Sequence, residues 1–299
     1  MVSRMQLGAW MEKIYGTLLR PKLYTCMICK SSYQINQTAP SRPPIPYEQH
    51  LLPLMCRKCI HLIPWIDALG CSDCGRAIRC PDCRRHPLQN DGLRANRSVV
   101  QYDDRMKQWL AQYKFKGNRE YEQIMLNMMQ LAYEPLLSTV WGLRTQERQM
   151  AKLFKGRLDE ILPDFITFVP TTRERLYARG FNQAEQLARA LGGKWGRPVI
   201  ELLARVQDAE KQSKQTRAGR EHNMEHAFTL RHTALKLLQE SWALHCTREV
   251  SRMEEVRLLL IDDVYTTGST LRACSRQLSS ICWGLGCPVS IVSYTWARA

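Results

Sequence analysis

The chain has 299 residues, of which 44% are hydrophobic, enough for one medium-sized α/β domain and a smaller module. No apolar stretch approaches the roughly 20 residues that span a bilayer, and the charged N-terminal segment lacks the apolar core of a signal peptide. We therefore expect a cytoplasmic protein without membrane insertion. The formal net charge of +15 favours a polyanionic partner, nucleic acid before membrane.

Eight of the twelve cysteines lie in the first 83 residues as four Cys-x-x-Cys pairs. Two thiolates on one tight turn occupy two corners of a tetrahedron, so two such pairs close a structural zinc site. Disulfides are the poorer interpretation in a cytosolic chain. The sequence predicts one or two structural Zn²⁺ ions, with the pairs combined in chain order or crossed. The predicted metal ligands are Cys26, Cys29, Cys56, Cys59, Cys71, Cys74, Cys80 and Cys83.

Two segments suggest where the cysteine-rich part ends. Residues 38–53 are rich in proline and are predicted to form a loop between the first two pairs. The segment RRHPLQNDGLRANRS, which follows Cys83, has the composition of a linker. We therefore expect an N-terminal zinc-ribbon module in residues 1–95 and a second domain in residues 96–299.

Residues 106–137 are predicted to form two amphipathic helices with a break at residues 116–118. The residues expected on one face of the second helix are Ile124, Met128, Leu131 and Leu136. Basic side chains cluster around the break, which predicts either a solvated turn or a contact with nucleic acid. These basic residues are Lys114, Lys116 and Arg119.

A short β-branched run, residues 165–169, predicts a buried parallel strand, followed by a basic loop and a helix that begins near Asn182. In open α/β sheets the loop after such a strand lies where ligands bind. The loop contains Arg173, Arg175 and Arg179, and guanidinium groups favour a phosphate or pyrophosphate ligand.

A second strand is predicted for residues 256–261, with Asp262 and Asp263 where it leaves the sheet. The following turn, residues 266–270, offers hydroxyls, a glycine and the backbone N–H groups of a helix start, which together suit a phosphate. The carboxylates are better suited to sugar hydroxyls or Mg²⁺. The two loops together predict a phosphorylated ribose that carries a pyrophosphate.

The stretch LLLIDDVYTTGST resembles the phosphoribosyl-pyrophosphate motif of type I phosphoribosyltransferases. More narrowly, VPTTRERLYARGFNQAEQLARAL, RAGREHNMEHAF and the preceding cysteine pairs resemble the ComF (ComFC) family of competence proteins. This resemblance covers the chain from about Cys26 to the C-terminus. It implies a type I phosphoribosyltransferase-like domain with a central parallel sheet flanked by helices, preceded by a zinc ribbon.

The resemblance also implies roles for individual residues. Asp262 and Asp263 would contact the ribose hydroxyls, and Arg175 and Arg179 would lie near the pyrophosphate; Thr171–Thr172 stand where the family usually has Leu-His. The residues expected to bind the 5′-phosphate are Thr266, Thr267, Gly268, Ser269 and Thr270. A flexible hood over the ligand would contain Gln212, Arg217, Arg220 and Asn223, although the same segment is also compatible with a mobile surface loop.

Two hypotheses follow from these patterns. In the first, the protein is a late-competence factor for natural transformation that handles incoming single-stranded DNA and binds phosphoribosyl pyrophosphate with Mg²⁺. A helicase-like competence ATPase and other DNA-uptake proteins are the implied partners, through which it could reach the membrane. In the second, it is an active phosphoribosyltransferase, although no acceptor pocket is identifiable in the sequence. The candidate aromatic residues for base stacking or for packing are Trp109, Tyr113, Phe115 and Tyr177.

Overall fold

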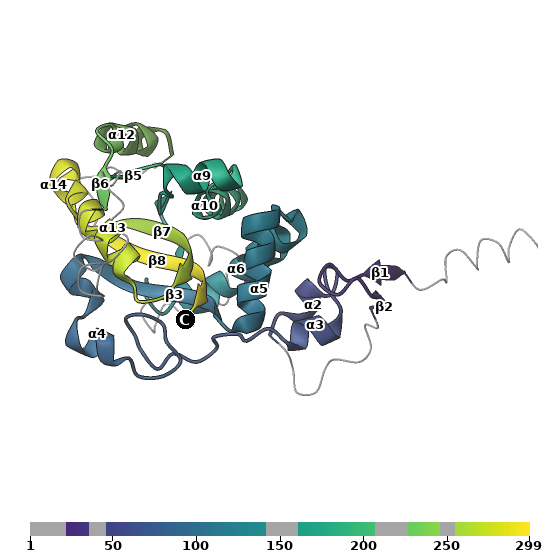
Figure 1. Cartoon of the computed structure of the whole chain (residues 1–299). Helices are drawn as coiled ribbons and strands as arrows, with labels where there is room; N and C mark the ends of the chain where they lie inside the picture. Colours follow the sequence, from purple (N-terminus) through teal and green to yellow (C-terminus); the bar gives the residue numbers. More distant parts are fainter. Residues whose placement is uncertain (1–21, 36–45, 142–160, 207–226, 246–254) are drawn as a thin grey trace, which may run out of the picture. The chain divides into compact units, whose positions relative to one another are not determined.

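The computed structural model describes residues 22–35, 46–141, 161–206, 227–245 and 255–299 (Figure 1). The chain divides into two compact units, the first ending at Ile63 and the second beginning at Pro64. This division precedes the domain boundary expected near residue 95. It separates the first two cysteine pairs from the last two.

The described part of the first unit contains two strands and two short helices. Strands β1 (Leu23–Thr25) and β2 (Ser32–Gln34) form an antiparallel hairpin. Helices α2 (Glu48–Leu51) and α3 (Arg57–His61) follow, so the end of the predicted proline-rich loop is helical, whereas residues 38–45 lie outside the described residues. The Tyr33 hydroxyl donates to the Leu52 carbonyl and ties the hairpin to the α2 end.

The second unit is built on a four-stranded parallel sheet in the order β3–β8–β7–β4. The strands are β3 (Leu93–Gln101), β4 (Phe165–Phe168), β7 (Val256–Tyr265) and β8 (Val289–Arg298). Almost every residue of β4 and β8 is buried, as expected for parallel strands that are covered on both faces. The prediction of an α/β fold with a central parallel sheet flanked by helices is confirmed.

Helices cover this sheet on both faces (Figure 1). Helices α6 (Arg119–Leu137) and α10 (Gln183–Trp195) pack on each other and on the sheet, with α5 (Asp104–Lys116) beside α6. The hydroxyl of Tyr294 on β8 donates to the Met129 carbonyl of α6, which links this helix to the sheet. Helix α13 (Ser269–Ser279) contacts β8 and β3 and is followed by α14 (Ile281–Leu285).

Smaller elements complete the second unit. Helix α4 (Pro81–Arg85) and the 3-10 helix η1 (Leu88–Asp91) precede β3. Helix α9 (Arg173–Arg179) lies between β4 and α10. An antiparallel pair, β5 (Leu203–Arg205) with β6 (Phe228–Leu230), leads to α12 (Ala234–His245).

Several local predictions need correction. The segment after Cys83 is not a linker, because Leu88 and Leu93 are fully buried and anchor it to the core. Strand β7 does not end at Ile261, because β8 pairs with it as far as Tyr265. The two helices around the break are confirmed. Ile124 is buried as predicted, but Leu131 is only partly buried, because the buried face of α6 runs through positions 128, 132 and 136.

Candidate functional site

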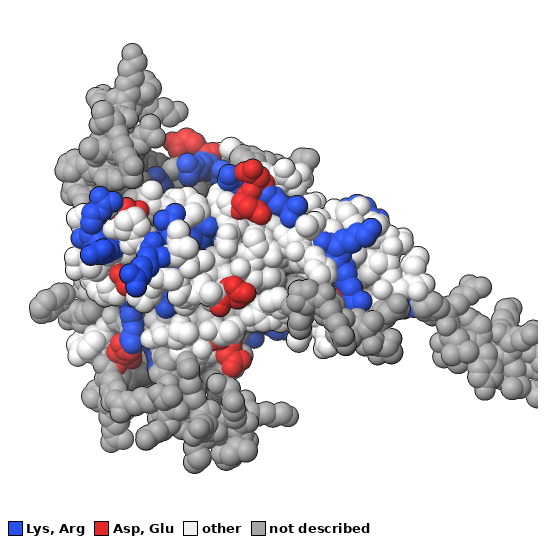
Figure 2. Space-filling model, turned by 90° about the horizontal axis from the view of Figure 1, so that it is seen from below, with Lys and Arg blue, Asp and Glu red and all other residues white. Residues whose placement is uncertain are grey.

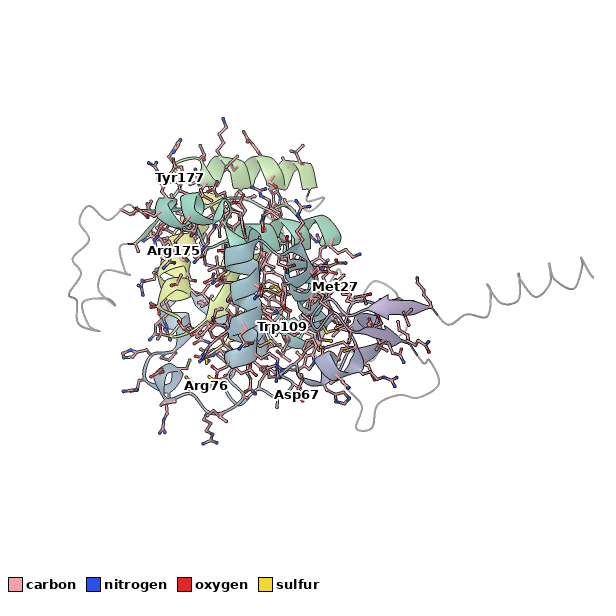
Figure 3. All side chains as sticks on the ribbon, turned by 45° about the vertical axis from the view of Figure 1, so that its right-hand side comes forward. Met27, Asp67, Arg76, Trp109, Arg175 and Tyr177 are labelled. Atoms are coloured by element: carbon pink, nitrogen blue, oxygen red, sulfur yellow. The ribbon has the colours of Figure 1, made fainter. Side chains whose placement is uncertain are left out.

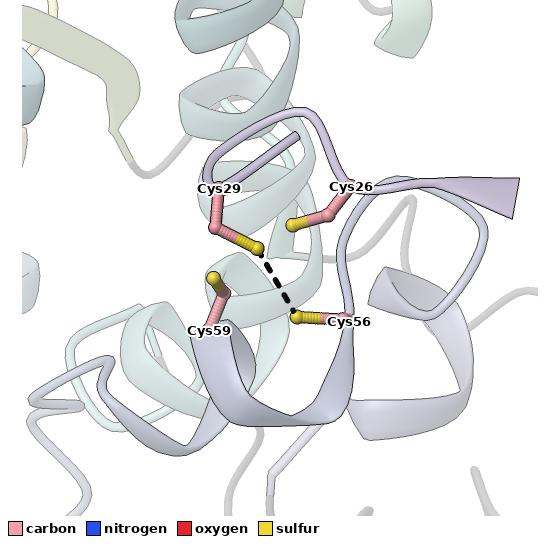
Figure 4. A group of neighbouring side chains, drawn as sticks. All are labelled: Cys26, Cys29, Cys56 and Cys59. Atoms are coloured by element: carbon pink, nitrogen blue, oxygen red, sulfur yellow. Dashed lines mark hydrogen bonds between the residues drawn. The ribbon is translucent and has the colours of Figure 1, made fainter. Parts of the chain in front are cut away.

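The first cysteine cluster lies entirely within the first unit (Figure 4). Cys26 and Cys29 flank the turn of the β1–β2 hairpin, and Cys56 and Cys59 lie at the start of α3. Their four sulfurs lie within 4.8 Å of one another, and those of Cys29 and Cys56 are 3.7 Å apart. A tetrahedral zinc ion with Zn–S bonds of about 2.3 Å separates its sulfurs by about 3.8 Å. These four thiols can therefore hold zinc as a closed structural site.

The thiols of this cluster differ in their surroundings. The Ser31 hydroxyl lies 2.9 Å from the Cys29 sulfur, and the hydrogen bonds of Ser31 lower the pKa of Cys29 to about 6. Burial instead raises the pKa of Cys59 well above its ordinary value. A divalent cation removes that difference, because it binds all four sulfurs as thiolates.

The second cysteine cluster belongs to the second unit and is part of its hydrophobic core. The sulfurs of Cys71, Cys74 and Cys83 lie within 4.8 Å of one another, and Cys80, the N-cap of α4, is the nearest remaining cysteine in the chain. The cysteine pairs thus associate in chain order, and this cluster can also hold zinc. The Asn96 amide of β3 donates to the Cys74 carbonyl over 3.1 Å, so the cluster is tied to the sheet.

The chain reverses its direction across the sheet between β4 and β7. From β4 it passes through α10 to Val199, which bridges in parallel to Ile166 on the outer side of β4. It returns through β7 on the inner side of β4 and passes through α13 to β8. Open α/β sheets bind ligands at such a switch point, beside the carboxyl ends of the strands. The loops after β4 and β7 are therefore the expected place for a ligand.

The loop after β7 has the geometry of a phosphate-binding turn. Gly268 is the N-cap of α13 with φ of 83°, a conformation that favours glycine. Its backbone also passes so close to the Tyr265 ring that a Cβ atom would lie 2.2 Å from the hydroxyl oxygen. Thr266 and Thr267 are exposed. Free backbone N–H groups at the start of an eleven-residue helix, with hydroxyls beside them, suit an anion.

The two aspartates lie at the carboxyl end of β7 and differ in their partners. Asp263 forms an ion pair with Lys114 of α5, and both side chains are mostly buried. Burial and the neighbouring Asp263 carboxylate raise the pKa of Asp262 to about 8, against the opposing influence of Lys114 and Arg175. A partly buried carboxyl group with a raised pKa at a switch point is a sign of a functional site.

The predicted basic loop after β4 is helix α9, which corrects the sequence prediction. The Thr172 hydroxyl caps the helix by accepting from the Arg175 N–H over 3.2 Å, and Gly180, with φ of 78°, ends it. No residue of α9 is buried (Figure 3). Arg175 lies near enough to influence Asp262, whereas the Arg179 guanidinium donates to the Gln183 side chain of α10 over 3.0 Å.

The other predicted residues are dispersed. Lys114 lies at Asp263, Arg119 is exposed at the start of α6, and the Lys116 side chain lies outside the described residues. The predicted hood, with Gln212, Arg217, Arg220 and Asn223, also lies outside them. Among the aromatic residues, Trp109 and Tyr113 are buried, whereas Tyr177 on α9 is 88% exposed (Figure 3).

The known proteins that are similar to this chain carry related names. The chain is 29% identical to competence protein ComFC of Bacillus subtilis, over 82% of this chain and 84% of the relative. It is 26% identical to the DNA utilization protein YhgH of Salmonella typhimurium, over 75% of this chain and 88% of the relative. Competence protein F of Haemophilus influenzae is 24% identical, over 77% and 87%. These relatives support the resemblance to the ComF family. No family model matches the chain.

The structure adds contacts that the sequence did not predict. Lys114, which the sequence placed in a basic cluster for solvent or nucleic acid, forms an ion pair with Asp263. Arg298, at the end of β8, donates to the Thr266 carbonyl over 3.0 Å and lies against the Tyr265 ring. The long separation along the chain hid both contacts. Among the described residues, no helix has the length and apolarity needed to cross a membrane.

Proposed function

We propose that this protein acts in natural transformation as a competence protein that handles incoming single-stranded DNA and binds phosphoribosyl pyrophosphate or a related phosphorylated ribose. The similarity to ComF-family proteins supports the first part, since the relatives carry the names competence protein and DNA utilization protein. The resemblance makes a helicase-like competence ATPase and other DNA-uptake proteins the proposed partners. A cytoplasmic location accords with this role.

One observation carries the ligand proposal. The carboxylates of Asp262 and Asp263, the glycine-capped start of α13 and the arginines of α9 follow two adjacent parallel strands at a switch point of the sheet. A ligand with a diol between two phosphate groups matches this order of carboxylate, N–H and guanidinium groups. An isolated glycine-rich turn would support only a phosphate.

Each group has a defined part in the proposed complex. The turn from Thr266 to Thr270 takes the 5′-phosphate, and the two aspartates take the ribose hydroxyls or a Mg²⁺ ion that accompanies the pyrophosphate. Arg175 takes the pyrophosphate, because its charge lies near enough to Asp262 to lower the pKa of that carboxyl group. Arg179 is held toward α10 and contributes through the field of its charge.

For DNA, α9 offers a better surface than the predicted cluster around Lys114. Tyr177 is 88% exposed, Leu176 is 44% exposed, and three arginines share the same seven residues. Exposed aromatic rings among cations bind single strands by stacking and by charge. On the face in Figure 2, Lys and Arg side chains lie in separate patches, which suits a diffuse electrostatic attraction.

The ligand assignment is tested by the double variant Asp262→Asn, Asp263→Asn. Titration calorimetry with phosphoribosyl pyrophosphate and Mg²⁺ should show binding to the wild type and none to the variant, while a cooperative thermal unfolding transition should show that the variant is folded. The control Asp67→Asn, at an exposed position, should bind like the wild type. Unchanged affinity in the double variant would contradict the assignment.

The DNA assignment is tested by Tyr177→Ala and by Tyr177→Phe, which keeps the ring. Loss of one stacked base is expected to weaken binding of an oligothymidylate by about 1–3 kcal/mol, and the phenylalanine variant should retain most of the affinity. Fluorescence anisotropy at several salt concentrations measures both. Equal affinity of all three proteins would place the DNA elsewhere.

The same ligand preparation tests the alternative of an active phosphoribosyltransferase. Pyrophosphate release that depends on an added nucleobase or amine, and that disappears in the double aspartate variant, would favour the transferase. Binding without release supports the proposal made here.

A further inference from the structure

Arg298 of β8 lies between the second cysteine cluster and the turn that follows β7. The Arg298 residue is only 7% exposed. One terminal nitrogen of its guanidinium lies 3.4 Å from the Cys74 sulfur, and the other donates to the Thr266 carbonyl over 3.0 Å and also contacts the Ala299 carbonyl. A single rigid, planar group thus contacts a predicted metal ligand and the first residue of the candidate phosphate turn.

The Tyr265 ring strengthens this connection. The Arg298 guanidinium carbon lies 4.5 Å from the ring centroid, and Tyr265 is 2% exposed. The far end of the same ring lies against Gly268, the N-cap of α13. The turn is therefore supported at both ends, at Thr266 by the guanidinium and at Gly268 by the ring that stacks on it.

The cysteine side of the connection is equally well fixed. The Cys74 carbonyl accepts from Asn96 on β3, and the Asn96 side chain in turn accepts from Ser293 on β8 over 2.9 Å. Cys74 itself is completely buried. Any movement of Cys74 when the cluster gains or loses a metal ion is therefore transmitted to Arg298, because neither side chain has room to adjust independently.

We infer that Arg298 is a positioning residue that couples metal binding at the second cysteine cluster to anion binding at the turn from Thr266 to Thr270. A metal ion that fixes Cys74 holds Arg298 in place to bind the Thr266 carbonyl, which keeps the backbone N–H groups of the turn directed at the anion. This inference rests on the proposed function for the identity of the anion. Because coupling is reciprocal, a bound anion also raises the affinity of the second cluster for its metal by the same factor.

The chain offers a matched set of variants. Cys71→Ser weakens the second cluster, and Cys26→Ser weakens the first, so the two differ in site but not in chemistry. Arg298→Gln removes the connection. Arg272→Gln is the control for loss of a half-buried arginine, since that side chain donates to the His86 and Pro87 carbonyls rather than to Cys74 or Thr266.

The first measurement is amide hydrogen exchange in the zinc-loaded full-length chain, which needs no ligand. Cys71→Ser should speed exchange in peptides that cover residues 263–272 by about 5-fold or more, and Cys26→Ser should leave them unchanged. In the Arg298→Gln background, Cys71→Ser should add nothing further. Equal exchange in these peptides for Cys71→Ser and the wild type would overturn the inference.

The second measurement is affinity for phosphoribosyl pyrophosphate with Mg²⁺. Cys71→Ser and Arg298→Gln should each weaken binding about 5- to 10-fold without adding to one another, whereas Cys26→Ser and Arg272→Gln should not. If the wild type does not bind, the proposed ligand is wrong, and the exchange result alone decides the coupling. If it binds and all four variants match it, the ligand stands and the coupling is wrong.

Discussion

The two cysteine clusters share their spacing but differ in what surrounds them. The first is bounded by a two-stranded hairpin and one turn of helix, and it lies in a unit of its own. The second lies in the hydrophobic core of the second unit, called the sheet domain below, in contact with β3 and Arg298. A Cys-x-x-Cys pair therefore predicts a ligand geometry and says nothing about which part of the protein the metal stabilises.

This difference assigns separate tasks to the two sites. A small unit would depend on a bound metal for folding, and loss of that metal would be a local event. A metal site inside a larger core adds to a structure that already has a buried sheet. Its functional value then lies in what it positions, and the candidate here is the turn after β7.

Replacing one cysteine in each cluster gives the largest expected effect. Cys74→Ser should lower the free energy of unfolding of the sheet domain by several kcal/mol, on the order of 3, because it removes a metal ligand and leaves a polar hydroxyl in the core. Cys26→Ser should leave that transition unchanged and unfold only the first unit. Thermal unfolding with metal analysis measures both, and a common shift of one transition would show that the clusters are not independent.

The sequence pointed to the residues of the candidate site, but it missed part of the framework that holds them. Asp262, Asp263 and Gly268 were singled out because a strand, a pair of carboxylates and a glycine turn follow one another within the chain. The helical state of α9 was missed, since seven residues with no buried side chain have no apolar periodicity to reveal them. The cap by Thr172 and the end at Gly180 were the only available signals.

Contacts between distant segments were beyond the sequence. Arg298 and Cys74 are 224 positions apart, and Lys114 and Asp263 come from elements with no shared motif. The linker prediction after Cys83 failed for a related reason. Its composition is polar, but Leu88, Leu93 and residues 95–98 are buried once the core is assembled. Local composition describes the exposed side chains of such a segment and misses the buried ones.

A smaller effect is expected at Gly268, which stacks against the ring supported by Arg298. Gly268→Ala combines a positive φ with a collision at Tyr265 and should lower the free energy of unfolding of the sheet domain by about 2–3 kcal/mol. Gly180→Ala has a similar φ of 78° but no neighbour within 4 Å, so about 1 kcal/mol is expected. Urea unfolding measures both, and equal losses would show that the Tyr265 contact is unimportant.

The pH dependence of stability provides a further test within the sheet domain. The folded chain holds the Asp262 proton up to a pKa of about 8, whereas the ordinary value is 3.8, so the folded state binds more protons between these values. Stability contributed by the neutral carboxyl group is therefore lost as the pH rises through this range. Asp262→Asn should be the more stable protein at pH 9, by about 1 kcal/mol or more, with the difference vanishing near pH 4. Parallel curves for the two proteins would contradict the raised pKa.

The smallest effect is expected in the first unit, at Lys30. This residue follows Cys29 in the hairpin turn and has φ of 61°, which L-residues rarely adopt. Its backbone N–H donates to the Cys26 carbonyl over 2.9 Å, so the conformation belongs to the metal-binding turn. Lys30→Gly should relieve about 0.5–1 kcal/mol of strain, tighten metal binding at the first cluster about 2- to 5-fold, and leave the second cluster unchanged. Chelator competition measures the metal affinity of each cluster separately. Tighter binding at both clusters would show that their metal affinities are not independent.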